Sequence, residues 1–301
     1  MIPLVVIGGP TASGKTALSV ALAKKIGGEI VSADSMQIYK YMDIGSAKPT
    51  EEEKEGVPHH LMDVALPTEN FSLGDYLMLA RKAIEDIYSR GKMPIVVGGT
   101  GLYINSLINN IELTDETDTL KIREKLAKFA EDEGTEALYK KLQEIDPESA
   151  ERIHPNNVKR VMRAIEIYES TGKTMTETLE ESKRPPIYKA FQYGIDYDRE
   201  VLYERINKRV DIMIEQGLVE EVKALVKMGC RRDNTSMQGI GYKEVLDYLD
   251  GKLDQSEMAD EIKQATRRYA KRQITWFKRN DMVWIKPDEI DVDALVKEIR
   301  K

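Results

Sequence analysis

The first third of the chain alternates between continuous apolar runs and segments of helical character. Apolar runs with the length of buried strands lie at residues 2–7 and 95–97, and a further short strand is predicted at residues 29–33. Helical composition occupies residues 17–26 and 72–87, between these runs. Strands that alternate with helices in this way predict a parallel sheet with right-handed crossovers.

The second of these helices has a recognisable start. Ser72 is followed three residues later by Asp75, a pair with the form of a capping box. The apolar face that we expect this helix to turn toward the sheet comprises Met78, Leu79, Ala83, Ile84 and Ile87.

The pattern changes near residue 111, and from there to about residue 189 it is helical. One face of a helix is formed by Val158, Val161, Met162, Ile165 and Tyr168. No segment of this stretch has a convincing strand pattern. We therefore expect an all-helical domain at 111–189, inserted into an α/β core.

The α/β pattern resumes after the insertion. Strand patterns occur at residues 191–195 and 282–285, and helical patterns begin near residues 199, 258 and 292. The predicted core therefore comprises residues 1–110 and 190–301.

Composition narrows the class of protein. Of the 301 residues 41% are hydrophobic and 32% charged, as in a folded globular protein. No apolar run approaches the roughly 18 residues of a membrane span, and no secretory leader pattern is found, so we expect a cytoplasmic protein without a membrane partner. A single cysteine excludes an internal disulfide, and only three histidines argue against a transition-metal site.

Charge is unevenly distributed along the chain. The net charge is −7, yet residues 261–286 hold eight Lys or Arg against two acidic residues. A basic segment on an acidic protein suits binding to a phosphate backbone, whereas most charged runs are only solvated.

The first predicted strand leads into Gly9-Pro10-Thr11-Ala12-Ser13-Gly14-Lys15-Thr16. This segment fits the P-loop pattern, and the helical segment at 17–26 follows it. Free N–H groups at the helix start and the charge of Lys15 would bind a polyphosphate, and the Thr16 hydroxyl can hold Mg²⁺. The alternative is an ordinary glycine-rich turn. The sequence thus predicts a P-loop NTPase-like parallel sheet flanked by helices.

Two further segments end strands at the same edge of the sheet. Asp34 follows the second strand and should face the same crevice as Lys15. It can accept a proton, hold a metal through water, or merely cap the next turn.

Gly98-Gly99-Thr100-Gly101 ends the third strand and can form a second anion-facing turn, or only a tight turn that needs one glycine. An ATPase or kinase often has an acid here to position Mg²⁺, and this chain has none.

Several basic residues share helix faces and have a functional or a merely solvated interpretation. They are Arg205 with Arg209, Lys159 with Arg163 beside Arg160, and the ridge of Lys263, Arg267 and Lys271. The pair His59-His60 is interpreted as structural, in a turn, in preference to a metal site.

Taken together, these segments resemble the bacterial tRNA dimethylallyltransferase (tRNA isopentenylpyrophosphate transferase) family over nearly the whole chain. The ordered markers are residues 9–16, Asp34-Ser35-Met36-Gln37 with Tyr39, Pro58-His59-His60-Leu61 with Asp63, Gly98 to Tyr103, His154-Pro155-Asn156 with Arg160 and Arg163, Gln238 to Tyr242, and Thr266 to Gln273.

The resemblance implies transfer of a dimethylallyl group from dimethylallyl diphosphate to N6 of adenosine 37 in tRNA, with release of diphosphate. Asp34 would accept a proton from N6 or orient that amine. Lys15, Arg209 and Mg²⁺ on Thr16 would neutralise charge on the leaving group. The implied catalytic residues are Asp34, Thr100, Lys15 and Arg209, and the implied diphosphate-binding residues are Gly9, Thr11, Ala12, Ser13, Gly14, Lys15 and Thr16.

The implied macromolecular partner is the anticodon stem-loop of tRNA, with the target adenine flipped out of its stack. The positions expected to face tRNA are Asp34, Ser35, Met36, Gln37, Thr100, Arg123, Lys159, Arg160, Arg163, Gln238, Lys243, Arg267 and Lys271. We expect a monomer. Two competing interpretations are a small-molecule or nucleotide kinase that uses the same P-loop, and a non-catalytic RNA-binding protein with a vestigial P-loop.

Overall fold

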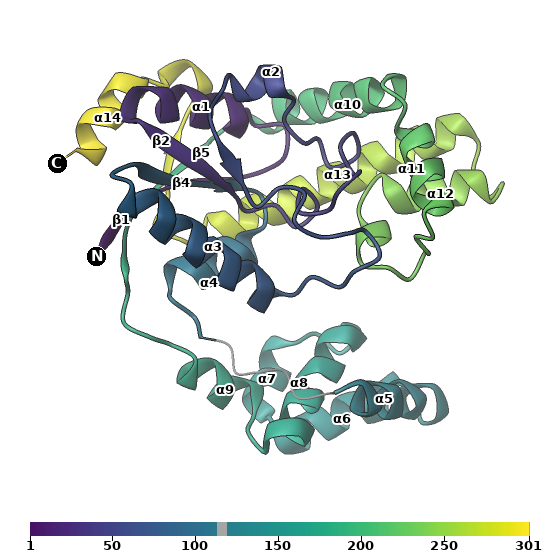
Figure 1. The fold of residues 1–301 in the computed structure, drawn as a ribbon. Helices are drawn as coiled ribbons and strands as arrows, with labels where there is room; N and C mark the ends of the chain where they lie inside the picture. Colours follow the sequence, from purple (N-terminus) through teal and green to yellow (C-terminus); the bar gives the residue numbers. More distant parts are fainter. Residues whose placement is uncertain (113–118, 301) are drawn as a thin grey trace. The chain divides into compact units, whose positions relative to one another are not determined.

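The computed structural model describes residues 1–112 and 119–300. These residues divide into two compact units (Figure 1), and each is described by itself. The first unit comprises Met1–Ile108 and Pro186–Lys301, and the second comprises Asn109–Pro185.

A six-stranded sheet forms the centre of the first unit. Its strands are β1 (Ile2–Gly8), β2 (Gly28–Ser32), β3 (His59–His60), β4 (Met93–Gly98), β5 (Tyr188–Ile195) and β6 (Val283–Ile285). They lie in the order β3-β2-β4-β1-β5-β6, and every neighbouring pair is parallel. The predicted parallel sheet is therefore confirmed, and only the two-residue strand β3 was absent from the prediction.

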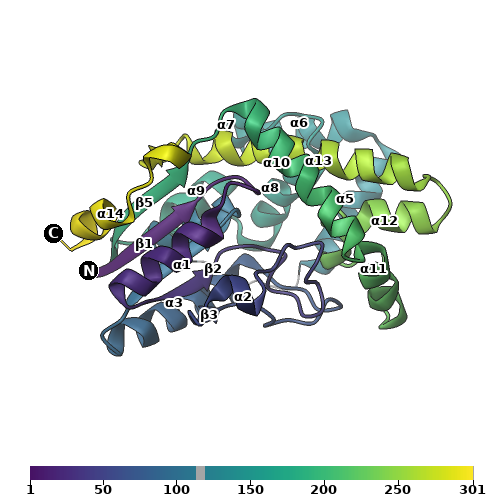
Figure 2. The same cartoon turned by 90° about the horizontal axis from the view of Figure 1, so that it is seen from above.

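Helices cover both faces of this sheet (Figures 1 and 2). On one face lie α1 (Lys15–Ile26) and α14 (Val292–Ile299), and on the other lie α3 (Leu73–Ser89) and α4 (Gly101–Ile108). In β1, Val5 and Ile7 pack toward α1, whereas Leu4 and Val6 pack toward α3 and α4. Successive side chains of a strand point to opposite faces, so a strand buried on both sides is apolar throughout.

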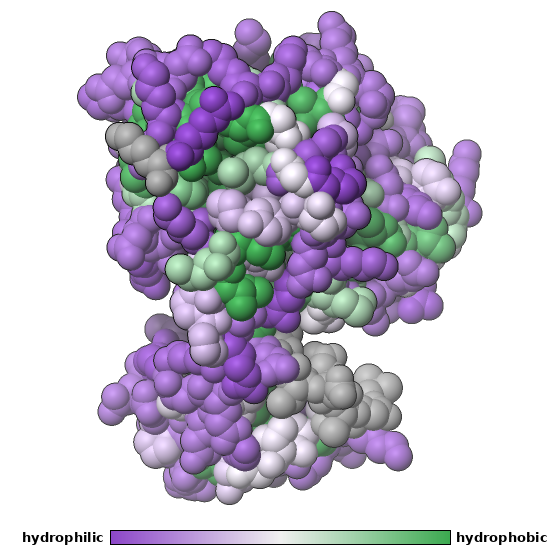
Figure 3. Space-filling view, turned by 60° about the vertical axis from the view of Figure 1, so that its left-hand side comes forward, coloured by the Kyte–Doolittle hydropathy of each residue, from purple (hydrophilic) through white to green (hydrophobic). Residues whose placement is uncertain are grey.

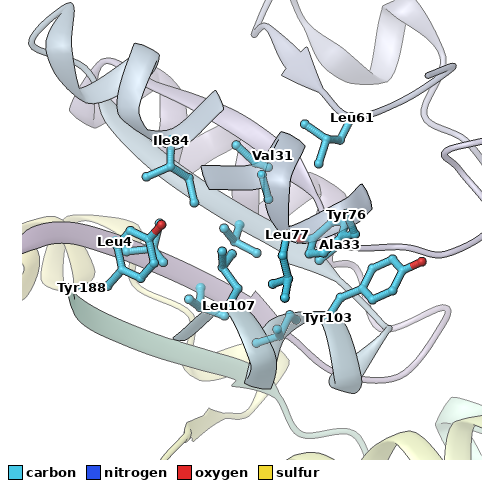
Figure 4. Packing of buried hydrophobic residues seen from close by; sticks show 14 of the residues in the cluster. Leu4, Val31, Ala33, Leu61, Tyr76, Leu77, Ile84, Tyr103, Leu107 and Tyr188 are labelled. Atoms are coloured by element: carbon cyan, nitrogen blue, oxygen red, sulfur yellow. The ribbon is translucent and has the colours of Figure 1, made fainter. Parts of the chain in front are cut away.

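The start of α3 agrees with the sequence, but its apolar face does not. Ser72 and Asp75 form the expected capping box. Met78, however, is 62% exposed, so its assignment to the buried face was wrong. The buried positions are Tyr76, Leu77, Ala80, Ile84 and Ile87. Leu77, Ala80 and Ile84 recur every three to four residues, and Met78 lies about 100° around the helix from Leu77. Figure 4 shows Tyr76, Leu77 and Ile84 of α3 in one cluster with Leu4 of β1, Val31 of β2, and Tyr103 and Leu107 of α4.

A second core lies among the C-terminal helices of the same unit. These are α10 (Arg199–Glu215), α11 (Leu218–Lys227), α12 (Tyr242–Leu249) and α13 (Gln255–Phe277). Side chains from the segment that follows β2, among them Tyr39 and Met42, pack with Val222 and Tyr242 in this core. Helix α13 begins three residues before the predicted start, because Asp254 and Glu257 form a capping box there.

The short elements of this unit were not predicted. They are α2 (Glu51–Lys54), η1 (Ser236–Gln238) and η2 (Pro287–Glu289), and α11 and α12 were also missed. Segments of this length contain too few turns for a helical period to stand out in sequence.

The second unit contains α5 (Leu120–Asp132), α6 (Thr135–Ile145), α7 (Pro147–Arg152), α8 (Val158–Thr171) and α9 (Met175–Glu181). All elements that the structure describes in this unit are helical, as the periodicity predicted. Leu138, Leu142, Val161 and Ile165 are fully or almost fully buried in its core. Helix α8 ends where Gly172 adopts a φ of 72°, in the left-handed region that glycine tolerates best.

Most of the face seen in Figure 3 is hydrophilic, with smaller hydrophobic areas between the polar residues. Among the residues that the structure describes, no helix combines the length and apolar character needed to span a bilayer.

Candidate active site

The P-loop connects the end of β1 to the start of α1. Gly9 has a φ of 138° and Gly14 a φ of 83°, values that favour glycine. Ala12 also has a positive φ, of 61°. The Ser13 hydroxyl donates to the Pro10 carbonyl at 2.9 Å, which closes the loop upon itself. The backbone is thus turned so that the N-terminus of α1 and Lys15 lie at the carboxyl edge of the sheet.

Lys15 lies within a set of charged groups. Its ammonium donates to the Pro10 carbonyl at 2.6 Å. Burial lowers the Lys15 pKa to about 8, the charge of Asp34 opposes this effect, and the charge of Arg209 adds to it. The structure therefore brings together Lys15, Asp34 and Arg209, which come from three distant parts of the sequence.

Asp34 follows β2 and is partly buried. Its Oδ1 accepts a hydrogen bond from the Met36 N–H at 2.9 Å, so the capping interpretation is correct as far as it goes. The negative charge of the same carboxylate acts on Lys15 and raises the Lys15 pKa against the effect of burial. Asp34 can therefore cap the turn through Met36 and still act on groups in the site.

The turn between β4 and α4 lies beside Asp34. Thr100 Oγ1 accepts from the Ser35 N–H at 2.9 Å. A Cβ on Gly98 would lie 2.1 Å from the Ala33 carbonyl oxygen, one on Gly99 2.2 Å from Gln273 Nε2, and one on Gly101 2.2 Å from Trp276 Cδ1. The contact at Gly98 is with backbone, which leaves no room for a side chain, whereas the contacts at Gly99 and Gly101 are with the side chains of Gln273 and Trp276.

Gln273 is a site residue that sequence reasoning assigned no role. Its Oε1 accepts from the Thr11 N–H of the P-loop at 3.0 Å, and its Nε2 donates to the Gly99 carbonyl at 2.9 Å. One side chain on α13 thus joins the two glycine-containing turns. The sequence gives no signal for this role, because α13 contains two other glutamines and burial distinguishes Gln273 only in the structure.

Tyr269, one turn earlier on α13, was also missed. Burial raises its pKa to about 12, as does the charge of Asp34, and a hydrogen bond with Thr100 lowers it. Its phenol is therefore neutral near pH 7 and lies beside Asp34 and Thr100.

Arg205 and Arg209, two of the arginines of α10, contact the loops of the site. Arg205 Nε donates to the Ala12 carbonyl at 2.8 Å, and its guanidinium lies 4.8 Å from the centre of the Tyr197 ring. Arg209 Nη2 donates to the Ala47 carbonyl at 3.3 Å. Burial lowers the Arg209 pKa, an effect that Glu53 and Asp34 oppose. Arg209 is therefore not part of a solvated face, whereas Arg205 is exposed and also contacts the P-loop.

The remaining residues expected to contact tRNA in this unit have varied environments. Gln37 Oε1 accepts from the Ser32 hydroxyl at 3.1 Å. On α13, Arg267 donates to Asn207 at 2.5 Å and Lys263 pairs with Asp211 at 2.6 Å, so part of the basic ridge ties α13 to α10. Lys271 and Gln238 are exposed, and Lys243 lies 3.4 Å from Glu244.

In the second unit one buried carboxylate holds two of the predicted arginines. Arg123 donates to Glu166 through Nε at 2.8 Å and Nη2 at 2.9 Å, and Arg163 pairs with the same carboxylate. Burial would raise the Glu166 pKa, but hydrogen bonds from Arg123 and Thr119 and the charge of Arg163 lower it. Lys159 and Arg160 are exposed on the first turn of α8.

The histidine pair lies in the strand β3 and not in the predicted turn. His60 Nε2 lies 2.8 Å from the buried Glu29 carboxylate, which Arg90 and Lys92 also contact. His59 Nδ1 lies 2.8 Å from the Val57 carbonyl. Within residues 1–112 and 119–300, no group of three His, Cys, Asp or Glu side chains could hold a metal ion.

These features define a P-loop protein whose site has a carboxylate after β2 and a glycine-threonine turn after β4. The family described as IPP transferase matches residues 37–280. The tRNA dimethylallyltransferase of Acetivibrio thermocellus is 55% identical over 300 residues, which cover 99% of this chain and 96% of that protein. That of Caldanaerobacter subterraneus is 51% identical over 292 residues, covering 96% of this chain and 93% of the relative. The chain belongs to the tRNA dimethylallyltransferase (IPP transferase) family.

Solved structures agree with this assignment. The tRNA isopentenylpyrophosphate transferase of Bacillus halodurans has a TM-score of 0.73 and 46% identity, with 99% of this chain and 94% of that chain covered. A eukaryotic dimethylallyltransferase acting on tRNA has a TM-score of 0.80 and 33% identity, with coverage of 99% and 78%. The predicted α/β fold with a helical insertion is therefore confirmed.

Proposed function

We propose that this protein transfers the dimethylallyl group of dimethylallyl diphosphate to N6 of adenosine 37 in tRNA and releases diphosphate. The single observation that carries the site assignment is the convergence of Lys15, Asp34 and Arg209 at the carboxyl edge of the sheet. Two cations beside a P-loop suit a diphosphate leaving group, and a carboxylate beside them suits proton transfer.

Each group has a defined task in this reaction. The P-loop and the start of α1 bind the diphosphate through backbone N–H groups other than that of Thr11, which Gln273 accepts. Lys15 and Arg209 neutralise the charge that develops as the carbon–oxygen bond breaks. Asp34, oriented by the Met36 N–H, accepts the proton that N6 loses as it attacks the allylic carbon. Thr100, oriented by the Ser35 N–H, offers its hydroxyl to the adenine or to Asp34.

The residues present also fit a magnesium ion. Mg²⁺ prefers a few oxygen ligands together with phosphate oxygens and water, and the Thr16 hydroxyl at the start of α1 is such a ligand. When bound, the ion would add positive charge at the leaving diphosphate.

The RNA partner in this proposal is the anticodon stem-loop. Exposed Lys159 and Arg160 on α8 and exposed Lys271 on α13 are available to phosphates. Arg123 and Arg163 are held in place by Glu166. Residues 34–37, beside the P-loop, would contact the flipped adenosine. We expect a monomer that acts in the cytoplasm, where tRNA is present.

The test is to replace Asp34 by asparagine, which keeps the acceptor for Met36 N–H but removes the base. We expect turnover to fall roughly 10²- to 10⁴-fold, the usual contribution of general base catalysis, with RNA affinity little changed. Single-turnover rates and RNA affinity are measured on the same preparation. A loss of RNA affinity that matches the loss of rate would show that Asp34 binds RNA and is not the base.

A further inference from the structure

One carboxylate outside the proposed site accepts an unusual set of hydrogen bonds. Glu221, on α11, accepts three consecutive backbone N–H groups, at 2.8 Å from Asp43, 2.7 Å from Ile44 and 3.0 Å from Gly45. The Tyr242 hydroxyl donates to the same carboxylate at 2.9 Å. Both carboxylate oxygens are therefore used, and a neutral side chain of the same shape has too few acceptors to replace them.

The segment that Glu221 holds is closely packed. A Cβ on Gly45 would lie 2.6 Å from Cζ of Tyr242, a residue that is fully buried. Lys48, at the end of the segment, pairs with Asp43 at 2.6 Å and with Asp63 at 2.7 Å.

This segment reaches the proposed site through Ala47. The Ala47 carbonyl accepts from Arg209 Nη2 at 3.3 Å and from Gln37 Nε2 at 3.3 Å. Ala47 has a φ of 49°, which a residue with a side chain adopts when its surroundings fix it there. The direction of this carbonyl depends on that turn, and the turn begins at the residues that Glu221 holds.

We propose that Glu221 is a positioning residue for Arg209, acting through the backbone of residues 43–47. It holds the turn that presents the Ala47 carbonyl, and this carbonyl aims the Arg209 guanidinium at the leaving diphosphate. The inference rests on the proposed role of Arg209 in binding that diphosphate. Glu221 itself contacts no substrate, so its effect is on the use of the donor and passes through Arg209.

The experiment compares Glu221→Gln with Glu220→Gln as a matched control. Glu220 is the preceding residue of α11, is exposed, and pairs with Lys223 at 3.2 Å. Each variant is assayed for kcat/KM toward dimethylallyl diphosphate at saturating anticodon stem-loop, and its urea midpoint is measured. Arg209→Gln and the Glu221→Gln/Arg209→Gln double variant complete a mutant cycle.

We expect Glu221→Gln to lower kcat/KM for the donor roughly 10- to 100-fold, the range for a displaced positioning contact, and Glu220→Gln to stay within about twofold. The double variant should be no worse than Arg209→Gln alone. Additive losses, or wild-type donor kinetics in Glu221→Gln, would overturn the inference. Wild-type donor kinetics in Arg209→Gln would instead refute the proposed role of Arg209, and the inference with it.

If Glu221→Gln does not fold, Tyr242→Phe gives a milder perturbation. It removes one of the four donors to Glu221 and should lower kcat/KM for the donor by a smaller factor that again vanishes in the Arg209→Gln background. A loss that persists in that background would overturn the inference.

Discussion

Gln273 offers a direct test of how the site is held together. Replacing it by leucine keeps much of its volume but removes both hydrogen bonds of its amide, to the Thr11 N–H at 3.0 Å and to the Gly99 carbonyl at 2.9 Å. Replacing it by glutamate keeps the acceptor for Thr11 but turns the donor to Gly99 into a second acceptor. Leucine therefore removes both hydrogen bonds, whereas glutamate removes only the hydrogen bond to Gly99 in the β4–α4 turn.

The expected cost follows from burial. Gln273 is 6% exposed, so the groups it leaves without partners are poorly reached by water. An unsatisfied buried polar group costs about 1–3 kcal/mol. Leucine leaves two such groups and should lower the free energy of unfolding by about 2–6 kcal/mol. Glutamate leaves one and adds a buried charge facing a carbonyl oxygen, so its cost should be at least about 2 kcal/mol.

Urea denaturation measures these losses, and an unchanged slope shows that the unfolded state is the same. Donor kinetics measured where both variants are folded should show a raised KM for dimethylallyl diphosphate, because the P-loop is no longer fixed to the β4–α4 turn. Wild-type stability together with wild-type donor kinetics in Gln273→Leu would refute this reasoning.

Three further predictions concern other parts of the molecule. Because the Lys15 pKa is lowered to about 8, its ammonium loses its proton above that pH, so the KM for the donor should rise there; in Lys15→Arg, which stays charged, the rise should be absent. In Glu166→Ala two arginines lose their shared partner, so the unfolding free energy should fall by about 1–3 kcal/mol and RNA binding should weaken. Urea titration measures the first effect and filter binding the second. Since the Glu166 pKa is lowered, its stabilising effect is present near pH 7 and is lost as pH falls through the folded-state pKa, so urea midpoints of wild type and Glu166→Ala should converge in acid.

Sequence patterns predicted the elements that are determined by residues adjacent in the chain. A strand buried on both faces is apolar throughout, so β1 and β4 could be predicted from their continuous apolar runs. The P-loop followed from its spacing, and the start of α3 from the Ser72 and Asp75 pair. These features are local, because the residues that determine them are adjacent in the chain.

The contacts that were missed join residues far apart in sequence. Gln273 reaches Thr11 across 262 positions, and Glu221 reaches Asp43 across 178. No period or spacing encodes such a pair, and a polar side chain gives no sign of which distant group it contacts. The error at Met78 has a different cause, since an apolar residue beside a buried stripe is exposed when the stripe turns away from it.

The central claim is tested most directly by changing the donor. The protein and Mg²⁺ are incubated with an anticodon stem-loop that carries A36 and A37, with dimethylallyl diphosphate in one reaction and ATP in the other, and the digested RNA is examined by mass spectrometry. We expect a dimethylallyl-adenosine, at position 37 alone, only with the allylic donor. Consumption of ATP with no modified adenosine in either reaction would contradict the account and favour a kinase.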